Sequence, residues 1–393
     1  MSVQMARVIF HVDLDAFFVA VERVLDRSLV GKPIAVGGSS NNRGVVMSAS
    51  YEARRYGVRS AMSAAEARRL CPDIIFVHGH MSEYRKVSAR FIDILHDFTP
   101  VVEQVSVDEA YLDMAGTERL SGTPEAAARH MKGRIVTELG ITASIGIAES
   151  KLVAKVASDE CKPDGLLRVP AGSSASFLAP MPVRKLPGLG PVAEKALSRL
   201  AIRTLGQLAA HPAGPIARLV GPGQADWLKA RAAGRDDSPI VPERDAKSIS
   251  VETTFAEDSN ETSFLNATLL QLSERVGERL RKGSTHARSV TVKARFHDFT
   301  TVTRQCTLSQ PVDGDDAIYH AARTLLDAIR RLRRAKLRLI GVGVGELTDE
   351  PGQLPLLESP NVHDSRLSST VDRIRQRFGR DAIRRAAVLT IKE

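Results

Sequence analysis

Hydrophobic and polar positions change their period along this chain of 393 residues, and the changes divide it into three parts. In the first part, short apolar runs rich in β-branched residues alternate with longer stretches whose apolar residues recur at helical spacing. This pattern predicts strands at 6–13, 33–36, 44–47, 101–107, 110–113 and 142–147, and helices at 17–25, 51–55, 64–70, 84–98 and 124–139. Strands and helices that alternate in this way predict an α/β fold around a mixed sheet.

The other two parts have different patterns. Residues 171–235 are helix-rich, with glycine and proline punctuation and few β-branched runs. A polar, charged and proline-broken stretch that follows is typical of a linker. Beyond it, strand patterns at 248–254, 289–296, 300–308 and 337–347 enclose helical patterns at 264–282 and 315–334. We therefore expect a multidomain protein that combines α/β and α+β domains, as its length also suggests.

Composition narrows the class of protein. A hydrophobic content of 43% with 26% charged residues predicts a soluble globular protein. No run of apolar residues is long enough to predict a membrane span, and the first residues lack a secretory h-region. The three cysteines lie far apart without metal-ligand spacing, which is typical of reduced thiols, so we expect a cytoplasmic protein.

A net charge of +9 and a pI near 9.6 suit a polyanionic partner. Many basic residues fall in two stretches of the C-terminal half, 279–295 and 330–338. With only five Tyr and one Trp, stacking on single-stranded bases is not the leading mode, and contact with a duplex backbone fits better. The residues that we expect to contact the DNA backbone from these stretches are Arg288, Lys293, Arg295, Arg331 and Arg333.

Carboxylates occur in two predicted strands, where burial makes charge expensive. If the strands lie side by side, Asp13, Asp108 and Glu109 converge on one point. Buried carboxylates that must stay ionised need cations, and Mg²⁺ prefers oxygen ligands. The three acids therefore predict a site for two metal ions that act in in-line displacement at phosphorus. The neighbouring Asp15 and Asp113 are expected to be structural acids.

A glycine hairpin around Gly188 and Gly190 opens a predicted helix in the helix-rich part. Such a turn exposes backbone N–H groups at a helix N-terminus, where they can bind a phosphate without reading a base. The alternative is a tight turn between two helices with no ligand.

Four short motifs stand in order at intervals that together point to a known family. The sequence resembles the Y-family translesion DNA polymerases, and within them the DNA polymerase IV branch, over nearly its whole length. The motifs are residues 13–18, 50–54, 106–111 and 162–165.

The resemblance implies a right-hand polymerase with four domains. These are a palm (residues 1–13 and 81–170), fingers (14–80), a thumb with a helix-hairpin-helix (171–236) and, after a linker (237–246), a little finger (247–349). Residues 350–393 would hold a clamp-binding motif and a tail.

The same resemblance implies the activity, which is low-fidelity, template-directed DNA synthesis without a proofreading exonuclease. Asp13, Asp108 and Glu109 become the catalytic residues that hold two Mg²⁺ ions, with Mn²⁺ as the alternative ion. The backbone carbonyl of Leu14 joins the second ion, and Glu109 engages mainly when both ions are present. The partners implied are primer–template DNA and an incoming dNTP, bound by a monomer.

A triphosphate needs cationic and hydroxyl donors. Tyr51 and Arg54 are three residues apart on one predicted helix and can reach the same anion. The resemblance assigns Ser48 as a further hydroxyl donor and Lys162 as a further cation.

Phe18 matches the steric gate of the family, a ring that leaves no room for a ribose 2′-hydroxyl. Phe17 beside it is expected to pack in the fingers core or against the sugar.

A glutamine followed by spaced leucines resembles the motif with which bacterial polymerases dock on the replication sliding clamp. Its residues are Gln353, Leu354, Leu356 and Leu357. Residues 368–379, which follow it, predict a short basic helix that we expect to be disordered when it has no partner.

Two other classes of function remain open at this point. One is a non-catalytic, clamp-bound adaptor on the same fold, although such relatives lose the carboxylates that this chain retains. The other is a different two-metal enzyme, such as a nuclease or a cyclase. Dependence on both a primed template and dNTPs separates the three.

Overall fold

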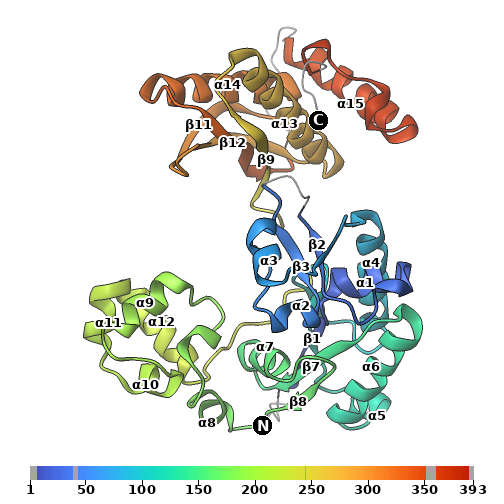
Figure 1. Cartoon of the computed structure of the whole chain (residues 1–393), viewed down its shortest axis with the longest axis vertical. Coiled ribbons are helices and arrows are strands. Elements are labelled where there is room, and N and C mark those ends of the chain that lie inside the picture. Colours follow the sequence, from blue (N-terminus) through green and yellow to red (C-terminus); the bar gives the residue numbers. More distant parts are fainter. Residues whose placement is uncertain (1–6, 39–42, 244, 351–359, 389–393) are drawn as a thin grey trace. The chain divides into compact units, whose positions relative to one another are not determined.

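The computed structural model describes residues 7–38, 43–243, 245–350 and 360–388. The chain divides into two compact units, Met1–Arg244 and Asp245–Glu393 (Figure 1). Their boundary falls within the stretch 237–246 that composition predicted to be a linker.

A five-stranded sheet forms the centre of the first unit, in the order β5-β6-β1-β7-β8. Its middle strand, β1, runs antiparallel to both of its neighbours, β6 and β7. The five strands are β1 (Ile9–Leu14), β5 (Val102–Gln104), β6 (Glu109–Asp113), β7 (Ala143–Ala148) and β8 (Leu166–Arg168).

The hairpin between β5 and β6 is tighter than the hydrophobic pattern predicts. The predicted strand 101–107 is wrong beyond Gln104, because the chain turns there and both Val105 and Ser106 donate backbone hydrogen bonds to the carbonyl of Glu109. Asp108 consequently lies in a turn and not in a strand.

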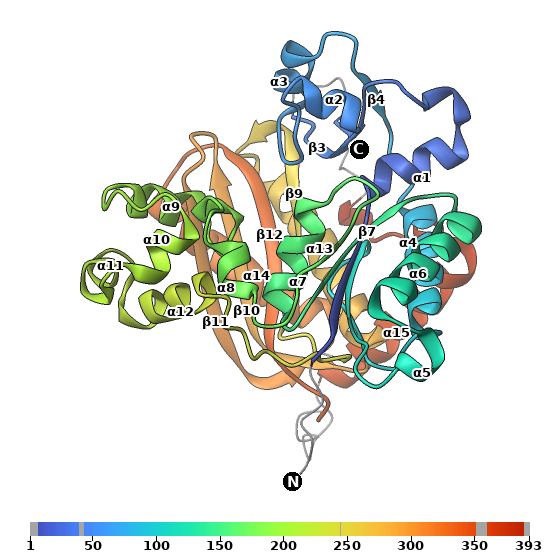
Figure 2. The same ribbon diagram turned by 90° about the horizontal axis from the view of Figure 1, so that it is seen from below.

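The two faces of β1 have different partners (Figure 2). Phe10 and Val12 lie in a core with the helices α4 (Met81–His96) and α6 (Pro124–Leu139), which cover one face of the sheet. Ile9, His11 and Asp13 alternate with them and face α7 (Lys151–Glu160). The hydrophobic pattern did not predict α7, which brings charged side chains to the face of β1 that carries His11 and Asp13. A short helix, α5 (Glu118–Ser121), precedes α6.

A second, three-stranded sheet has the order β3-β2-β4 and its own small core, built largely from alanines and valines. Ser50 caps the helix that follows β3, because its hydroxyl accepts the backbone N–H of Ala53. The elements are α1 (Phe17–Leu25), η1 (Arg27–Leu29), β2 (Ile34–Gly37), β3 (Val46–Ala49), α2 (Tyr51–Arg55), α3 (Ala64–Leu70) and β4 (Ile75–Val77).

The helix-rich part consists of five short α-helices and one 3₁₀ turn within the described residues. Gly188, in the predicted glycine hairpin, has a φ of +89°, and a Cβ there would lie 2.8 Å from the Trp227 ring. Only glycine fits this close approach. The elements are α8 (Ser174–Leu178), η2 (Val183–Lys185), α9 (Pro191–Ser198), α10 (Leu205–Ala210), α11 (Ala213–Val220) and α12 (Pro222–Ala232).

The stretch after α12 is not a free linker at its start. Asp236 accepts a hydrogen bond from the backbone N–H of Leu152, at 2.9 Å, and Val241 donates its N–H to Glu103, also at 2.9 Å. The same carboxylate of Glu103 forms a buried ion pair of 2.5 Å with Lys151. Residues 236–241 are therefore held against α7 and β5 by hydrogen bonds, which composition alone did not indicate.

The second unit is an antiparallel sheet of order β11-β10-β12-β9, with α13 and α14 packed on one face. The predicted tail helix is longer than expected, and it has a partner within the chain, since α15 packs against α13 and α14. No helix in the described part of the chain is both long and apolar enough to cross a membrane. The elements are β9 (Ser248–Ser259), α13 (Thr262–Lys282), β10 (His286–Phe296), β11 (Thr301–Val312), α14 (Asp315–Leu332), β12 (Leu337–Thr348), α15 (Pro360–Phe378), η3 (Arg380–Ala382) and η4 (Ala386–Val388).

Candidate active site

The three predicted carboxylates meet at one end of the central strands. Asp13, near the end of β1, is the cross-strand neighbour of Glu109, the first residue of β6. Asp108 is held beside them because its carbonyl accepts the backbone N–H of Leu14 at 2.9 Å. Oxygen atoms of Asp13 and Glu109 and a ring nitrogen of His11 lie within 4.8 Å of one another. The convergence that the two acidic stretches predict is therefore present.

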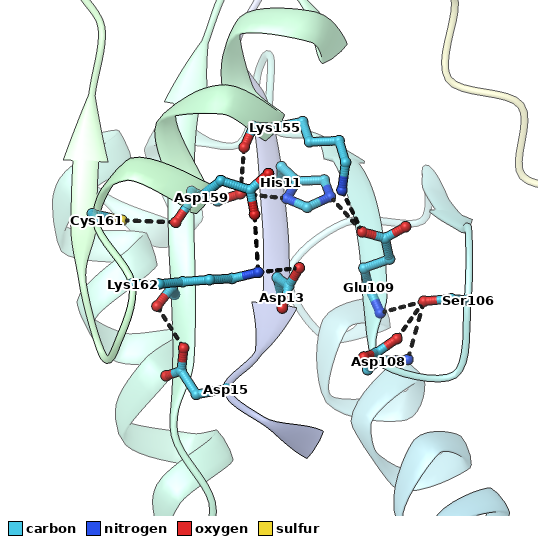
Figure 3. A network of polar contacts seen from close by, with 12 residues as sticks. His11, Asp13, Asp15, Ser106, Asp108, Glu109, Lys155, Asp159, Cys161 and Lys162 are labelled. Atoms are coloured by element: carbon cyan, nitrogen blue, oxygen red, sulfur yellow. Dashed lines mark hydrogen bonds and ion pairs between the residues drawn. The ribbon is translucent and has the colours of Figure 1, made fainter. Parts of the chain in front are cut away.

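Each of the three carboxylates has one oxygen in contact with a neighbouring side chain (Figure 3). The ammonium of Lys162 lies 2.7 Å from Asp13 Oδ2, and that of Lys155 lies 2.6 Å from Glu109 Oε2. Ser106 donates its hydroxyl to Asp108 Oδ1 at 2.5 Å. These contacts fix the orientation of the acids.

The environments of two acids differ strongly. Burial raises the pKa of Asp13 to about 6, against the opposing effect of Lys162, and the nearby Asp108 adds to the rise. The contacts with His11 and Lys155 lower the pKa of Glu109 to about 2. Burial thus destabilises the ionised form of Asp13 in spite of its ion pair with Lys162, and a bound cation would stabilise that form.

A cavity of about 180 Å³ opens beside the carboxylates. Ala16, Met47 and Ser60 contribute to its wall, and Glu109 does not line it. The other lining residues are nine that the sequence predicts for the metal and nucleotide site: Asp13, Leu14, Phe17, Phe18, Ser48, Tyr51, Arg54, Asp108 and Lys162.

The cationic side of the cavity is ordered by local contacts. Arg54 donates to the carbonyl of Ala49 at 3.0 Å, and its guanidinium lies 4.9 Å from the centre of the Tyr51 ring. Lys162 contacts Asp159, at 3.0 Å, as well as Asp13. The predicted triphosphate-binding residues therefore lie together.

Asp15 is a structural acid, in agreement with the expectation. It accepts hydrogen bonds of 2.8 Å from the hydroxyls of Thr142 and Ser144 and from the backbone N–H of Asp164. The Tyr51 hydroxyl lies 3.5 Å from the same carboxylate. Asp15 thus links the end of β1 to the loop that carries Lys162.

Phe18 is supported by residues that the sequence analysis did not single out. Its ring stacks on Tyr84, with 4.4 Å between centroids and 19° between planes. The Tyr84 hydroxyl donates to Glu22, a buried carboxylate that also accepts the backbone N–H of His80 at 3.2 Å. The sequence did contain a signal of this support, because Glu22 is an acid on the apolar face of the predicted helix 17–25. Phe17 is buried in the core and borders the cavity.

The predicted DNA-contacting residues occupy two places. Gly188 and Gly190 form the hairpin before α9 in the first unit. In the second unit, Lys293 and Arg295 share the face of β10 that is turned away from the core, and Arg288 is exposed at a bulge.

Several of these cations have partners. Lys293 pairs with Glu252 at 2.8 Å, and Arg295 donates to Thr301 at 3.0 Å. Arg333 pairs with Asp298 at 2.6 Å, while Arg331 is exposed at the end of α14. The predicted clamp-binding residues, 353–357, lie outside the described residues.

Comparisons with known proteins identify the family of this chain. The model of the impB/mucB/samB family matches residues 12–159, and the model of that family's C-terminal domain matches residues 246–356. DNA polymerase IV of Dehalococcoides mccartyi (strain CBDB1) is 43% identical over 387 residues, which cover 98% of this chain and 99% of that protein. DNA polymerase IV 2 of Mesorhizobium japonicum is 39% identical over 390 residues, covering 95% and 92% respectively.

A solved structure shares the fold. The Y-family DNA polymerase chimera of Dbh and Dpo4 superposes with a TM-score of 0.77 at 26% identity, over 86% of this chain and 98% of the chimera. The chain therefore belongs to the Y-family of DNA polymerases, the family that the impB/mucB/samB model describes. Within this family it falls in the DNA polymerase IV branch, that of the translesion enzymes.

Proposed function

We propose that this chain extends a primer 3′ end with dNTPs along a template, and that Asp13, Asp108 and Glu109 are its catalytic residues. The observation that carries the proposal is the position of these acids. They converge at the end of β1 beside a cavity that also holds the aromatic Phe18 and the cationic Lys162. A nucleotide bound there has its phosphates near the acids and its sugar near the ring.

The donor set fits hard divalent cations. Carboxylate oxygens of Asp13, Asp108 and Glu109, with the backbone carbonyl of Leu14, are the ligands that Mg²⁺ prefers. Polymerases of this family use divalent metal ions, and we propose two Mg²⁺ ions, with Mn²⁺ as an alternative. When bound, the ions lower the pKa of the primer hydroxyl and neutralise charge on the departing pyrophosphate.

The chain's own residues select and orient the nucleotide. Arg54 and Lys162 provide positive charge for the triphosphate, and Tyr51 and Ser48 provide hydroxyl donors. Phe18, fixed by its stacking on Tyr84, presents a rigid ring where a ribose 2′-hydroxyl would lie. Ribonucleotides are excluded by steric overlap with this ring.

We assign the first unit to palm, fingers and thumb, and the second unit to the little finger. The five-stranded sheet with the acids is the palm, and the three-stranded sheet is the fingers. The helices 174–232 are the thumb, whose glycine hairpin binds the duplex backbone through N–H groups at the start of α9. The basic face of β10, with Lys293 and Arg295, binds the duplex backbone in the little finger.

Primer extension tests the proposal. We expect short, distributive extension of an undamaged primed template with Mg²⁺ and dNTPs, abolished by Asp108→Asn. Asp113→Asn is the matched control, because Asp113 lies at the far end of β6 and accepts the backbone N–H of Ala115. No synthesis by the wild type, with duplex binding intact, would favour the adaptor function instead.

A sliding clamp is the further partner that we propose, and only the sequence motif supports it. Gln353 and Leu357 would occupy the clamp's apolar pocket. Co-elution with a bacterial clamp is expected for the wild type and is expected to be lost in a Gln353→Ala, Leu357→Ala double variant. The three separate cysteines, all free thiols, are consistent with a reducing cytoplasmic location.

A further inference from the structure

Glu109 differs from the other two acids in its attachment to α7. It does not line the cavity, and two residues, Lys155 of α7 and His11 of β1, contact its carboxylate (Figure 3). Lys155 lies 2.6 Å from Oε2, and His11 Nε2 lies 3.4 Å from the same oxygen. Among the described residues, the Lys155 ammonium and His11 Nε2 both approach this one oxygen.

His11 is a fixed part of this arrangement. Its side chain is fully buried, and Nδ1 lies 2.7 Å from the Ser158 hydroxyl, which itself donates to the carbonyl of Lys155 at 2.8 Å. The hydroxyl therefore accepts a hydrogen bond from Nδ1–H, and the ring is oriented with Nε2 towards Glu109. Nε2 faces Glu109 Oε2 at 3.4 Å but forms no hydrogen bond of good geometry within the described residues. Burying an unpartnered ring nitrogen against an acid is unfavourable, so packing alone does not account for it.

Lys155 is also well placed to compete with a metal ion. Its ammonium carries positive charge to an acid that neighbours Asp13 across the strands, where divalent cations are proposed to bind. The ammonium and such an ion would repel each other, and both would attract the Glu109 carboxylate. Removing one charge at this range changes a cation equilibrium substantially even when water screens it.

We propose that Lys155, oriented together with His11, is a positioning residue that holds Glu109 on the α7 side and thereby sets the cation concentration at which Glu109 joins the metal ligands. The proposal rests on the proposed function of Glu109. Binding of the cation exchanges the Lys155–Glu109 ion pair for a cation–carboxylate contact, and Lys155 then loses its partner. Glu109 is thus available as a ligand only when this exchange is favourable.

The direct test is equilibrium binding of Mn²⁺, followed by electron paramagnetic resonance, to the protein with a chain-terminated primer–template and the next dNTP. Lys155→Met keeps the length of the side chain and removes its charge. We expect its half-saturating Mn²⁺ concentration to fall by about tenfold. Lys155→Arg keeps the charge and should keep the wild-type curve. Lys185→Met is the matched control, since Lys185 pairs with Glu160 at 2.6 Å on the surface.

Repeating the Lys155→Met substitution in a Glu109→Gln protein shows whether the Lys155 charge affects Mn²⁺ binding through Glu109 or by direct repulsion of the ion. There we expect Lys155→Met to change Mn²⁺ binding less than twofold, because the competed carboxylate is gone. An equal shift in both backgrounds would show that Lys155 acts independently of Glu109. Unchanged or weaker Mn²⁺ binding by Lys155→Met would overturn the proposal as well. Primer extension by the wild type is measured in parallel, and its absence would contradict the proposed function itself.

Discussion

The rings of Phe18 and Tyr84 are stacked nearly parallel, with their centroids 4.4 Å apart and 19° between their planes. Tyr84 is fully buried, and its hydroxyl is bound to the buried carboxylate of Glu22. The ring that borders the cavity beside Asp13 is therefore supported by a second, buried ring. We therefore expect sugar selection to depend on both the Phe18 ring and the Tyr84 ring that supports it. Substitutions of the two residues test these contributions separately.

Replacement of Phe18 by alanine removes the ring itself. We expect Phe18→Ala to reduce the preference for dTTP over UTP by roughly 10- to 200-fold, because the space for a 2′-hydroxyl is then open. The measurement is the ratio of kcat/KM for the two nucleotides in single-nucleotide insertion. An unchanged ratio would rule out Phe18 as the gate.

Tyr84→Leu leaves Phe18 in place and removes the stacked support. We expect the dTTP preference to fall by a smaller factor than in Phe18→Ala, since the Phe18 ring gains freedom to tilt. Tyr84→Phe is the control. It keeps the ring but takes the hydroxyl from Glu22, so it should lose about 1–3 kcal/mol of stability while it keeps the dTTP preference. An equal loss of the dTTP preference in Tyr84→Leu and Tyr84→Phe would contradict the idea that the stacked ring supports Phe18.

Asp13 should make folding sensitive to pH in buffer without divalent cations. Its pKa is raised by burial to about 6 from an ordinary value of 3.8, so the folded chain binds a proton that the unfolded chain releases. This contribution to stability is present below about pH 4 and is lost as the pH rises through about 6. Asp13→Asn should therefore stabilise the protein at pH 7.5 by about 1–3 kcal/mol, and not at pH 4.

Thermal unfolding of Asp13→Asn and the wild type at the two pH values measures this effect. Asp159→Asn serves as the control, because it also contacts Lys162 but is more exposed than Asp13. A variant that is less stable than the wild type at pH 7.5 would show that the ion pair with Lys162 outweighs the burial of the charge.

The buried Arg281 should contribute to holding the tail helix α15. Arg281 lies between Asp315, at 2.8 Å, and Asp372 of α15, at 2.6 Å. Asp372→Asn keeps Arg281 paired with Asp315 and weakens only the contact with α15, at an expected cost of about 1.5–3 kcal/mol. We expect faster amide hydrogen exchange in residues 367–378 with little change in β10.

Asp381→Asn provides the comparison for this prediction. Asp381 pairs with Arg384 three residues away, and its side chain is 79% exposed, so its loss should be nearly neutral. If both variants exchange at the wild-type rate, the Arg281–Asp372 ion pair is not what holds α15 in place.

Local sequence determined the boundaries of several elements. The helices at 17–25, 64–70 and 124–139 agree with the residues predicted, because their apolar residues recur at helical spacing. Two of them also begin at residues that can cap: Ser63 and Thr123 both accept a backbone N–H of the first turn. Period and capping act within a few residues, so sequence alone specifies them.

The sequence also indicated which acids meet. Carboxylates in two apolar stretches are costly to bury, and a cation that they bind in common offsets that cost. Asp13, Asp108 and Glu109 converge as that reasoning predicts. The turn that carries Asp108 was missed, since Val105 and Val107 have the composition of a strand. There the hydrogen bonds to the carbonyl of Glu109 overrode β propensity.

Tertiary structure alone decided what surrounds those acids. His11 and Ser158 are 147 positions apart in the chain and 2.7 Å apart in space, and Tyr84 meets Glu22 across 62 positions. Such pairings arise because packing a helix on a sheet brings together side chains that share no local pattern. The sequence therefore specified the acids of this polymerase, while tertiary packing determined what surrounds them: α7 brings Lys155 to Glu109 and lowers its pKa, and α4 brings Tyr84 to Phe18.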